Sequence, residues 1–251
     1  MNDDLSIFLG EWYEVGGFKV KNPKVEDIIK YGEENYISAI NIFTLKPSDM
    51  MVQLYDDGID YQKIDKYTLF CMMCSEILIS EENNKKSKIQ EKIGWLTGIF
   101  DFEIYLDSNK EMFLYSKSTG CKIDKGVYYL IRAFLLKINC KDDSEKYNPG
   151  NESTKKSIIQ QERRRMERER KKKSKSSVFI NYISSLVWGN TSGYKYEDVL
   201  KLNIWQFYDA IKRINKIKLF DYNMIGFYTG SIKYDDIKKI EEKISWDGKI
   251  I

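Results

Sequence analysis

The chain has 251 residues, of which 42% are hydrophobic and 14% aromatic, and it has a formal net charge of +3 and no histidine. This apolar content is sufficient for a packed core and excludes global disorder. The lack of histidine excludes Ser-His-Asp and Cys-His nucleophile pairs and metal sites built on imidazole. Chemistry based on carboxylates remains open.

The sequence also indicates where the protein resides. No stretch of about 18 uninterrupted apolar residues occurs, so we expect no membrane span and no membrane partner. The first residues, MNDDLSIF, lack the basic and long apolar regions of a secretory signal. We therefore expect a cytoplasmic protein whose four cysteines are reduced.

The first 80 residues read mainly as helices. Gly16 and Gly17 mark a turn before a strand-like FKVKN, and a helical period then runs to about residue 43, with Gly32 dividing it in two. Pro47 starts another helix, which Gly58 ends. An apolar, buried helix is expected over YTLFCMMCSEIL, followed by a polar loop or an exposed helical turn over residues 81–92.

The clearest β signal lies between residues 102 and 115. Alternation in FEIY and continuation in MFLY, separated by the turn residues DSNK, predict a β-hairpin. A second short strand pair is expected around Cys121–Ile123, and Asp124 is placed to cap a helix over VYYLIRAFLLKIN. These elements predict an α+β N-terminal domain, mostly α, over residues 1–148.

A strongly basic segment follows. Residues 154–177 contain eleven Lys/Arg and three acids, a local charge of 11 − 3 = +8, so the rest of the chain sums to 3 − 8 = −5. Glutamates three and four residues before basic residues predict a helix capped by Ser153 or Thr154, with a sparse apolar stripe in its first half. We expect a basic helical linker over 149–177, acting as a phosphate-binding helix, a partner-docking arm or a solvated connection. Its candidate basic residues are Arg163, Arg164, Arg165, Arg168, Arg170, Lys171, Lys172 and Lys173.

The rest of the chain predicts a small all-α domain over residues 178–251. An apolar helix ends at Gly189, Asn203 caps a long helix that Gly230 stops, and a last helix is expected over 234–244. This segment holds more aromatic residues than a module of its size needs for its own core, and aromatic residues are enriched at interfaces. Ordinary core packing is the equal alternative for this set. The candidate partner-binding residues are Trp188, Trp205, Phe207, Tyr208, Phe220 and Tyr228.

Other motifs point away from catalysis. Cys71 and Cys74 have CxxC spacing but lie inside an apolar helix, which favours buried core thiols over a redox or zinc site. The carboxylates of DDGID lack the spacing of a calcium loop and favour the C-terminal turn of a helix. No GxxxxGK[ST], GxGxxG, GxSxG or HExxH occurs. We expect no enzyme activity, no cofactor and no metal.

Two blocks, residues 19–61 and 194–230, together with the linker NPGNESTKKSIIQQERRR, carry a resemblance in overall layout. They resemble proteins of tailed phages of Gram-positive hosts that are grouped with tail-morphogenesis genes and called tail-assembly chaperones. The resemblance implies a non-enzymatic cytoplasmic factor that escorts the tape-measure protein, or another tail protein, until the tail tube forms around it. The alternatives are a nucleic-acid-binding protein that uses the basic helix, and a structural component of the virion neck or baseplate.

Overall fold

The computed structural model describes residues 4–78, 83–108, 110–145, 147, 149–171, 177–189 and 193–233. The fold is α+β and mostly α, as predicted. Within the described ranges, none of the helices combines the length and the apolar character needed to cross a bilayer.

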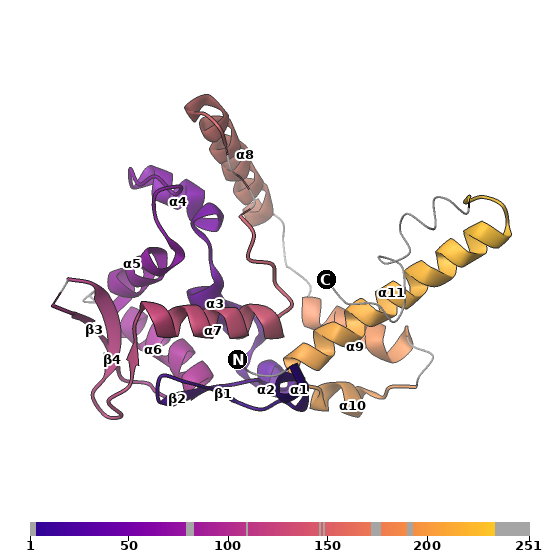
Figure 1. Cartoon of the computed structure of the whole chain (residues 1–251), viewed down its shortest axis with the longest axis horizontal. Helices are drawn as coiled ribbons and strands as arrows, with labels where there is room; N and C mark the ends of the chain where they lie inside the picture. The colour runs from indigo at the N-terminus through magenta and orange to yellow at the C-terminus, as the bar shows by residue number, and fades with distance from the viewer. Residues whose placement is uncertain are drawn as a thin grey trace.

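The chain opens with a short helix and a small hairpin that lie along the base of the molecule in Figure 1. These elements are α1 (Asp4–Leu9), β1 (Tyr13–Val15) and β2 (Phe18–Val20), and the two strands pair antiparallel. Gly16 and Gly17 form the turn with φ values of 57° and 85°, a backbone shape that favours glycine. The turn and the second strand agree with prediction. The sequence analysis missed α1 and β1, which are too short to show a period.

Several of the next helices begin or end at the predicted glycine and proline residues. Gly32, with φ of 98°, separates α2 (Val25–Tyr31) from α3 (Glu33–Thr44). Pro47 begins a 3₁₀ turn, η1 (Pro47–Met50), which continues into α4 (Met51–Asp56). The apolar stretch after it forms α5 (Lys66–Leu78).

One prediction in this region is wrong. Much of the segment expected to be a polar loop at residues 81–92 belongs to a helix of 15 residues, α6 (Asn83–Thr97). Ile89, Ile93 and Leu96 are buried in the main core, at spacings of four and three residues. The polar first half of the helix hid this apolar face, which becomes visible only in its second half.

A three-stranded antiparallel sheet of order β3-β4-β5 packs beside these helices. It consists of β3 (Phe102–Leu106), β4 (Met112–Ser116) and β5 (Lys122–Ile123), and the first two strands form the predicted hairpin. The helix α7 (Lys125–Ile138) follows, and the Asp124 carboxylate caps it by accepting a hydrogen bond from the Val127 amide at 3.0 Å, as predicted. The inner faces of α3, α5, α6 and α7 supply much of the main core.

A buried arginine joins three parts of this body. The side chain of Arg132, 2% exposed, donates hydrogen bonds to the carbonyl oxygens of Phe43 and Leu45 at 2.8 and 2.9 Å. Its guanidinium also pairs with Asp143 at 2.5 Å, and Lys66 pairs with the other oxygen of that carboxylate at 2.7 Å. Arg132 thereby holds the end of α3, the start of α5 and the segment after α7 together.

We expect Asp143→Asn to lower the free energy of unfolding by about 1–2 kcal/mol at about pH 7, because it leaves the buried guanidinium of Arg132 without its counter-charge. The loss is no larger because the carboxylate of Asp143 is partly solvated. Burial opposes the charge of Asp143, but Arg132 and Lys66 outweigh it and lower its pKa. The stabilisation is therefore complete above the unfolded pKa of about 3.9 and is lost as pH falls through the folded pKa.

Urea denaturation as a function of pH checks this expectation. The difference between wild type and variant should shrink steadily below about pH 4. The exposed Asp221→Asn substitution is the control and should change stability little. An equal difference at all pH values would show that the carboxylate charge has no role.

The C-terminal helices follow the prediction and share the main core. They are α9 (Val178–Trp188), α10 (Tyr196–Lys201) and α11 (Ile204–Tyr228). Phe179 stacks on Phe207 with ring centroids 5.4 Å apart and meets Tyr36 of α3 edge to face. The carboxylate of Glu33 accepts hydrogen bonds from the first amides of α9, including that of Val178 at 3.1 Å. The C-terminal helices are thus packed directly on the N-terminal ones.

The base of α11 is fixed at the junction with α2. The Ile204 amide donates to the Pro23 carbonyl at 2.8 Å, and the Val25 amide donates to the Leu202 carbonyl at 2.9 Å. Asn203 caps α11 as predicted, accepting from the Gln206 amide at 2.9 Å. Its side-chain amide donates to the carbonyl oxygen of Phe8 at 2.9 Å.

The division into residues 1–148, 149–177 and 178–251 stays a prediction, although the core runs without interruption from α3 into α9 and α11. The helix expected over 234–244 lies outside the described residues.

Candidate partner-binding surface and basic helix

The helix α11 is buried at its start and exposed at its end. Ile204 and Phe207 are fully buried, and Ile211 and Ile214 are partly buried against the main core. Beyond Ile214 the helix extends away from the body, as Figure 1 shows. Twelve residues, 217–228, lie in this distal part, about 18 Å of helix.

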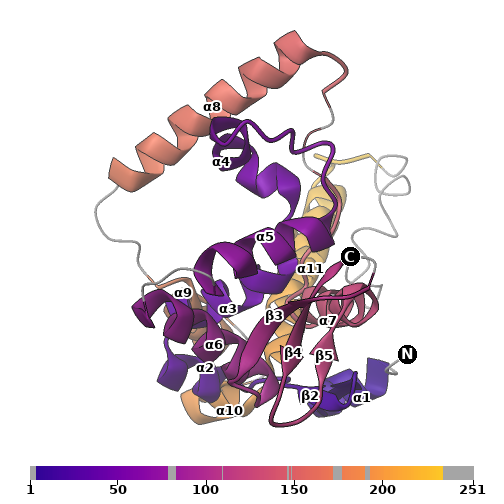
Figure 2. The same ribbon diagram turned by 90° about the vertical axis from the view of Figure 1, so that its left-hand side faces the viewer.

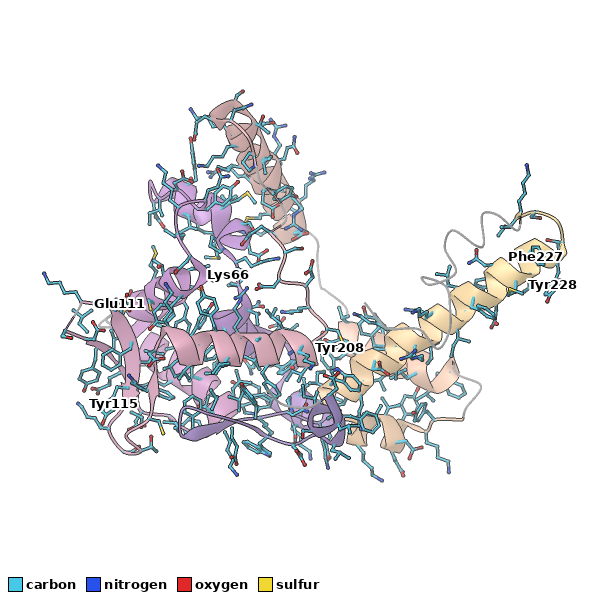
Figure 3. The ribbon with its side chains drawn as sticks, in the orientation of Figure 1. Lys66, Glu111, Tyr115, Tyr208, Phe227 and Tyr228 are labelled. Carbon is cyan, nitrogen blue, oxygen red and sulfur yellow. The ribbon has the colours of Figure 1, made fainter. Side chains whose placement is uncertain are left out.

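Large apolar side chains cover the distal part. Leu219, Tyr222, Ile225 and Tyr228 recur every three residues, so that each neighbours the next and the set, here called the α11 row, winds gradually around the helix, by about half a turn in all. Tyr222 is 70% exposed and Tyr228 is 77% exposed. Figure 3 shows Phe227 and Tyr228 at the far end of α11. A soluble helix usually places such residues against a core, so their exposure marks a candidate interface.

A groove of about 400 Å³ lies between the end of α9 and the middle of α11. Trp188 stands at this groove with 77% of its surface exposed, and its indole N–H donates to the Tyr196 hydroxyl at 2.9 Å. Ile211 and Ile214 line the opposite wall. An exposed tryptophan, an apolar wall and the nearby α11 row give this side of the molecule the composition of a protein interface.

The structure places the six predicted partner-binding residues differently. Trp188 and Tyr228 are exposed, and Tyr208 and Phe220 are half-buried. Trp205 is half-buried and packs edge to face on Phe8, with ring centroids 5.9 Å apart. Phe207 is a core residue that no partner can reach in this conformation, because it lies on the same side of α11 as Ile204 and both are fully buried.

Three exposed residues of the row were missed by the sequence analysis, namely Leu219, Tyr222 and Ile225. Their three-residue spacing was visible in the sequence. The sequence did not reveal the point where α11 leaves the body, and that point decides which apolar side chains are exposed.

The basic segment forms α8 (Glu152–Lys171), and its described residues show a docked helix. Asn151, rather than Ser153 or Thr154, accepts a hydrogen bond from a first-turn amide, that of Thr154, at 2.8 Å. The predicted apolar stripe packs on a second hydrophobic cluster formed mainly by α4, in which Ile159 is 2% exposed. A helix solvated on all sides is therefore the wrong interpretation of α8.

Ion pairs fix the inner face of α8. Lys155 pairs with Asp60, and Arg163 pairs with Asp56 at 2.5 Å. The hydrogen bond from Lys155 lowers the pKa of the Asp60 carboxyl. Asp56 is the last residue of α4, which confirms the prediction that this acidic cluster forms a helix C-terminal turn.

The other predicted basic residues divide into three groups. Arg165 pairs with Glu162 and Glu169 of its own helix. Lys172 and Lys173 lie outside the described residues. The remaining four, Arg164, Arg168, Arg170 and Lys171, are exposed.

We expect Ile159→Ala to lower the free energy of unfolding by about 2–4 kcal/mol, because it leaves a cavity between α8 and α4. If the two clusters unfold separately, the loss will show as earlier release of α8, detected as faster trypsin cleavage after Arg163. Ser157→Ala, on the exposed side of the same helix, should leave both readouts unchanged. No effect of Ile159→Ala on either readout would contradict the docking of α8.

The CxxC pair lies within α5, as predicted, and both Cys71 and Cys74 are buried. Burial raises the pKa of the Cys71 thiol to about 11 and also raises that of Cys74. Both groups are therefore protonated and unreactive at neutral pH. Among the described residues, no cluster of three or more His, Cys, Asp or Glu could hold a metal ion.

We expect neither Cys71 nor Cys74 to react with a maleimide in the folded protein at about pH 8, and both to react once urea unfolds it. Mass spectrometry of tryptic peptides measures the labelling at each position. Rapid labelling of Cys71 in the folded protein would show that α5 opens locally or that the thiol is accessible.

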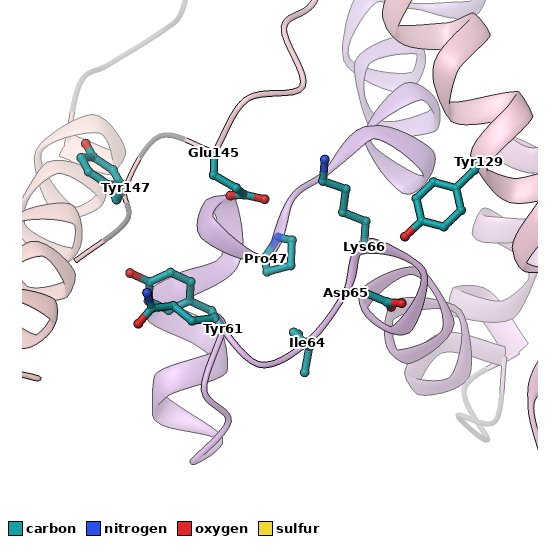
Figure 4. A pocket seen from close by; sticks show the side chains of 9 residues that line it. Pro47, Tyr61, Ile64, Asp65, Lys66, Tyr129, Glu145 and Tyr147 are labelled. Atoms are coloured by element: carbon teal, nitrogen blue, oxygen red, sulfur yellow. The ribbon is translucent and has the colours of Figure 1, made fainter. Parts of the chain in front are cut away.

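A larger cleft of about 620 Å³ separates the α4 region from the main body. Tyr61 from the segment after α4, Tyr129 from α7 and Tyr147 line it, as Figure 4 shows. The charged residues at its wall include Lys66, paired with Asp143, and Asp65, paired with Lys125. These pairs hold the fold together, and we assign no ligand to the cleft.

The comparisons with known proteins concern the C-terminal helices. Residues 171–250 match the family described as the YomV second domain, which is phage-associated, from the SPbeta region of Bacillus phage. The match covers α9, α10 and α11 and fits a protein of phage origin. No curated protein and no solved structure matches the chain.

Proposed function

We propose that this protein is a non-enzymatic morphogenesis factor of a tailed phage, a tail-assembly chaperone that binds the tape-measure protein or another tail protein. The observation that carries the proposal is the exposed α11 row, which extends from the body beside Trp188 and its groove. The match of residues 171–250 to a phage-associated family covers the segment that contains this row, and it supports a phage origin.

The row suits a helical partner. Two helices pack with their axes about 8–10 Å apart when the side-chain ridges of one fill the grooves of the other. The distal part of α11 offers about three turns for such packing. A partner helix lying along it would continue into the groove at Trp188, where an aromatic anchor of high binding energy is available.

A non-catalytic role is supported by what the charged side chains do. The chain has no histidine, and many of its described carboxylates are engaged in pairs that fix the fold, such as Asp143 with Arg132 and Asp60 with Lys155. The residues of the α11 row supply apolar contact area.

Co-expression with the tape-measure protein of the same phage tests the proposal. The full chain should keep the tape-measure protein in the soluble fraction, and Tyr222→Ala/Ile225→Ala/Tyr228→Ala should reduce the soluble amount at least about tenfold, because each anchor contributes about 1–2 kcal/mol. Point substitutions are preferable to deletion after residue 177, since deletion would remove Phe179 and Phe207 from the shared core.

The matched control replaces three exposed aliphatic residues elsewhere, as Ile29→Ala/Leu106→Ala/Leu130→Ala, and should retain full solubilisation. Circular dichroism should show that both triple variants stay folded. Equal solubilisation by wild type and the α11 variant would reject the α11 row as the docking surface. Stoichiometric recovery of the protein from purified virions would indicate a structural component rather than a chaperone.

A further inference from the structure

The helix α8 separates its charges between two faces. On the inner face, Lys155 and Arg163 are neutralised by Asp60 and Asp56 of the α4 region. Arg165 holds the carboxylates of Glu162 and Glu169. Docking on α4 therefore neutralises two basic residues of α8, and pairing within the helix engages two of its three acids.

The outward side carries a row of exposed basic side chains. Lys156, Arg164, Arg168 and Lys171 are all exposed, and their spacings of eight, four and three residues place them along one side of the helix, here called the outer basic face. Among the described residues, no carboxylate lies within ion-pairing distance of any of the four. Glu167 lies among them, so the local charge is 4 − 1 = +3.

We propose that the outer basic face binds the phosphate backbone of nucleic acid without sequence preference. Like charges four residues apart, as at Arg164 and Arg168, disfavour a helix, and the single acid among them, Glu167, offsets only part of this repulsion. A polyanion would relieve it, with release of counterions from the nucleic acid as the driving force. This binding activity is separate from the proposed chaperone function and uses a different helix.

The chemistry of the face favours a nucleic acid over a protein. Its other exposed residues are Ser157, Gln160 and Gln161, which can donate hydrogen bonds to phosphate oxygens. The face has no exposed apolar or aromatic residue, so it lacks both the anchors of a protein interface and the stacking platforms that read bases. The residues of the outer basic face therefore favour contact with the sugar-phosphate backbone of a nucleic acid alone.

The position of the face allows a long polyanion to approach. Figure 2 shows α8 lying across one end of the molecule, with α4 on its inner side. The span from Lys156 to Lys171 is 15 residues, or about 22 Å of helix. A DNA duplex presents about 13 phosphate charges over the same distance, which is ample for four cations.

Fluorescence anisotropy with a labelled duplex DNA of about 24 base pairs tests the inference on the full chain. Four phosphate contacts predict a slope of log K against log salt of about −3.6, so affinity should fall about 100-fold between about 50 and 200 mM KCl. Arg164→Ser/Arg168→Ser/Lys171→Ser should reduce the slope to about −1 and weaken binding at about 50 mM salt by about 30-fold or more.

The matched control, Lys30→Ser/Lys63→Ser/Lys122→Ser, makes the same change in net charge on other exposed positions and should keep both the slope and most of the affinity. Circular dichroism and trypsin protection should confirm that α8 stays docked in the α8 variant. Two duplexes of unrelated sequence should bind equally.

Three results would overturn the inference. These are the absence of duplex binding at about 50 mM salt, equal losses in the two triple variants, and equally tight binding of a polyglutamate peptide, which would assign the face to an acidic protein. Loss of tape-measure solubilisation in the α11 variant does not bear on these results, so the two proposals fail separately.

Discussion

The direction of α11 depends on the position of Asn203. Its side-chain oxygen caps the helix, its amide is bound to the carbonyl of Phe8, and the backbone on both sides of it pairs with the segment before α2. The fit is close, since a Cβ at Gly10 would lie 3.2 Å from the Asn203 side-chain nitrogen. With its first turn fixed in this way, the helix has only half its length supported by the core. The remainder extends into solvent with its apolar row exposed.

The α4–α8 unit shows a comparable dependence on a few contacts. Carboxylates at the end of α4 neutralise the inner cations of α8, and Ile159 closes the cluster between the helices. Leu69 of α5 belongs to the same cluster, so the unit is connected to the main core. The same ion pairs determine which basic residues remain exposed. Charge segregation is therefore a result of docking rather than of the sequence of α8 alone.

Much of the fold could be predicted because its signals are local. Asp124 and Asn203 cap helices within three residues of themselves, and Gly32 ends a helix by its own conformation. The failures concern distant partners. Nothing near Glu33 indicates that its carboxylate caps a helix 145 residues away, and nothing near Asp56 indicates its pairing with Arg163. The candidate site was hard to predict for the same reason, since only the folded body determines that Phe207 is buried and Tyr222 is exposed.

The helices α8 and α11 leave the body in different directions, as Figure 1 shows, and both are anchored in packed clusters rather than in linkers. The body therefore acts as a spacer of fixed length between two surfaces. A ligand held on one helix would be presented to the other at an effective concentration set by that geometry and not by bulk diffusion. Because neither surface overlaps the other, occupation of one leaves the other available. The fixed geometry of the body then determines how far binding at one surface favours binding at the other.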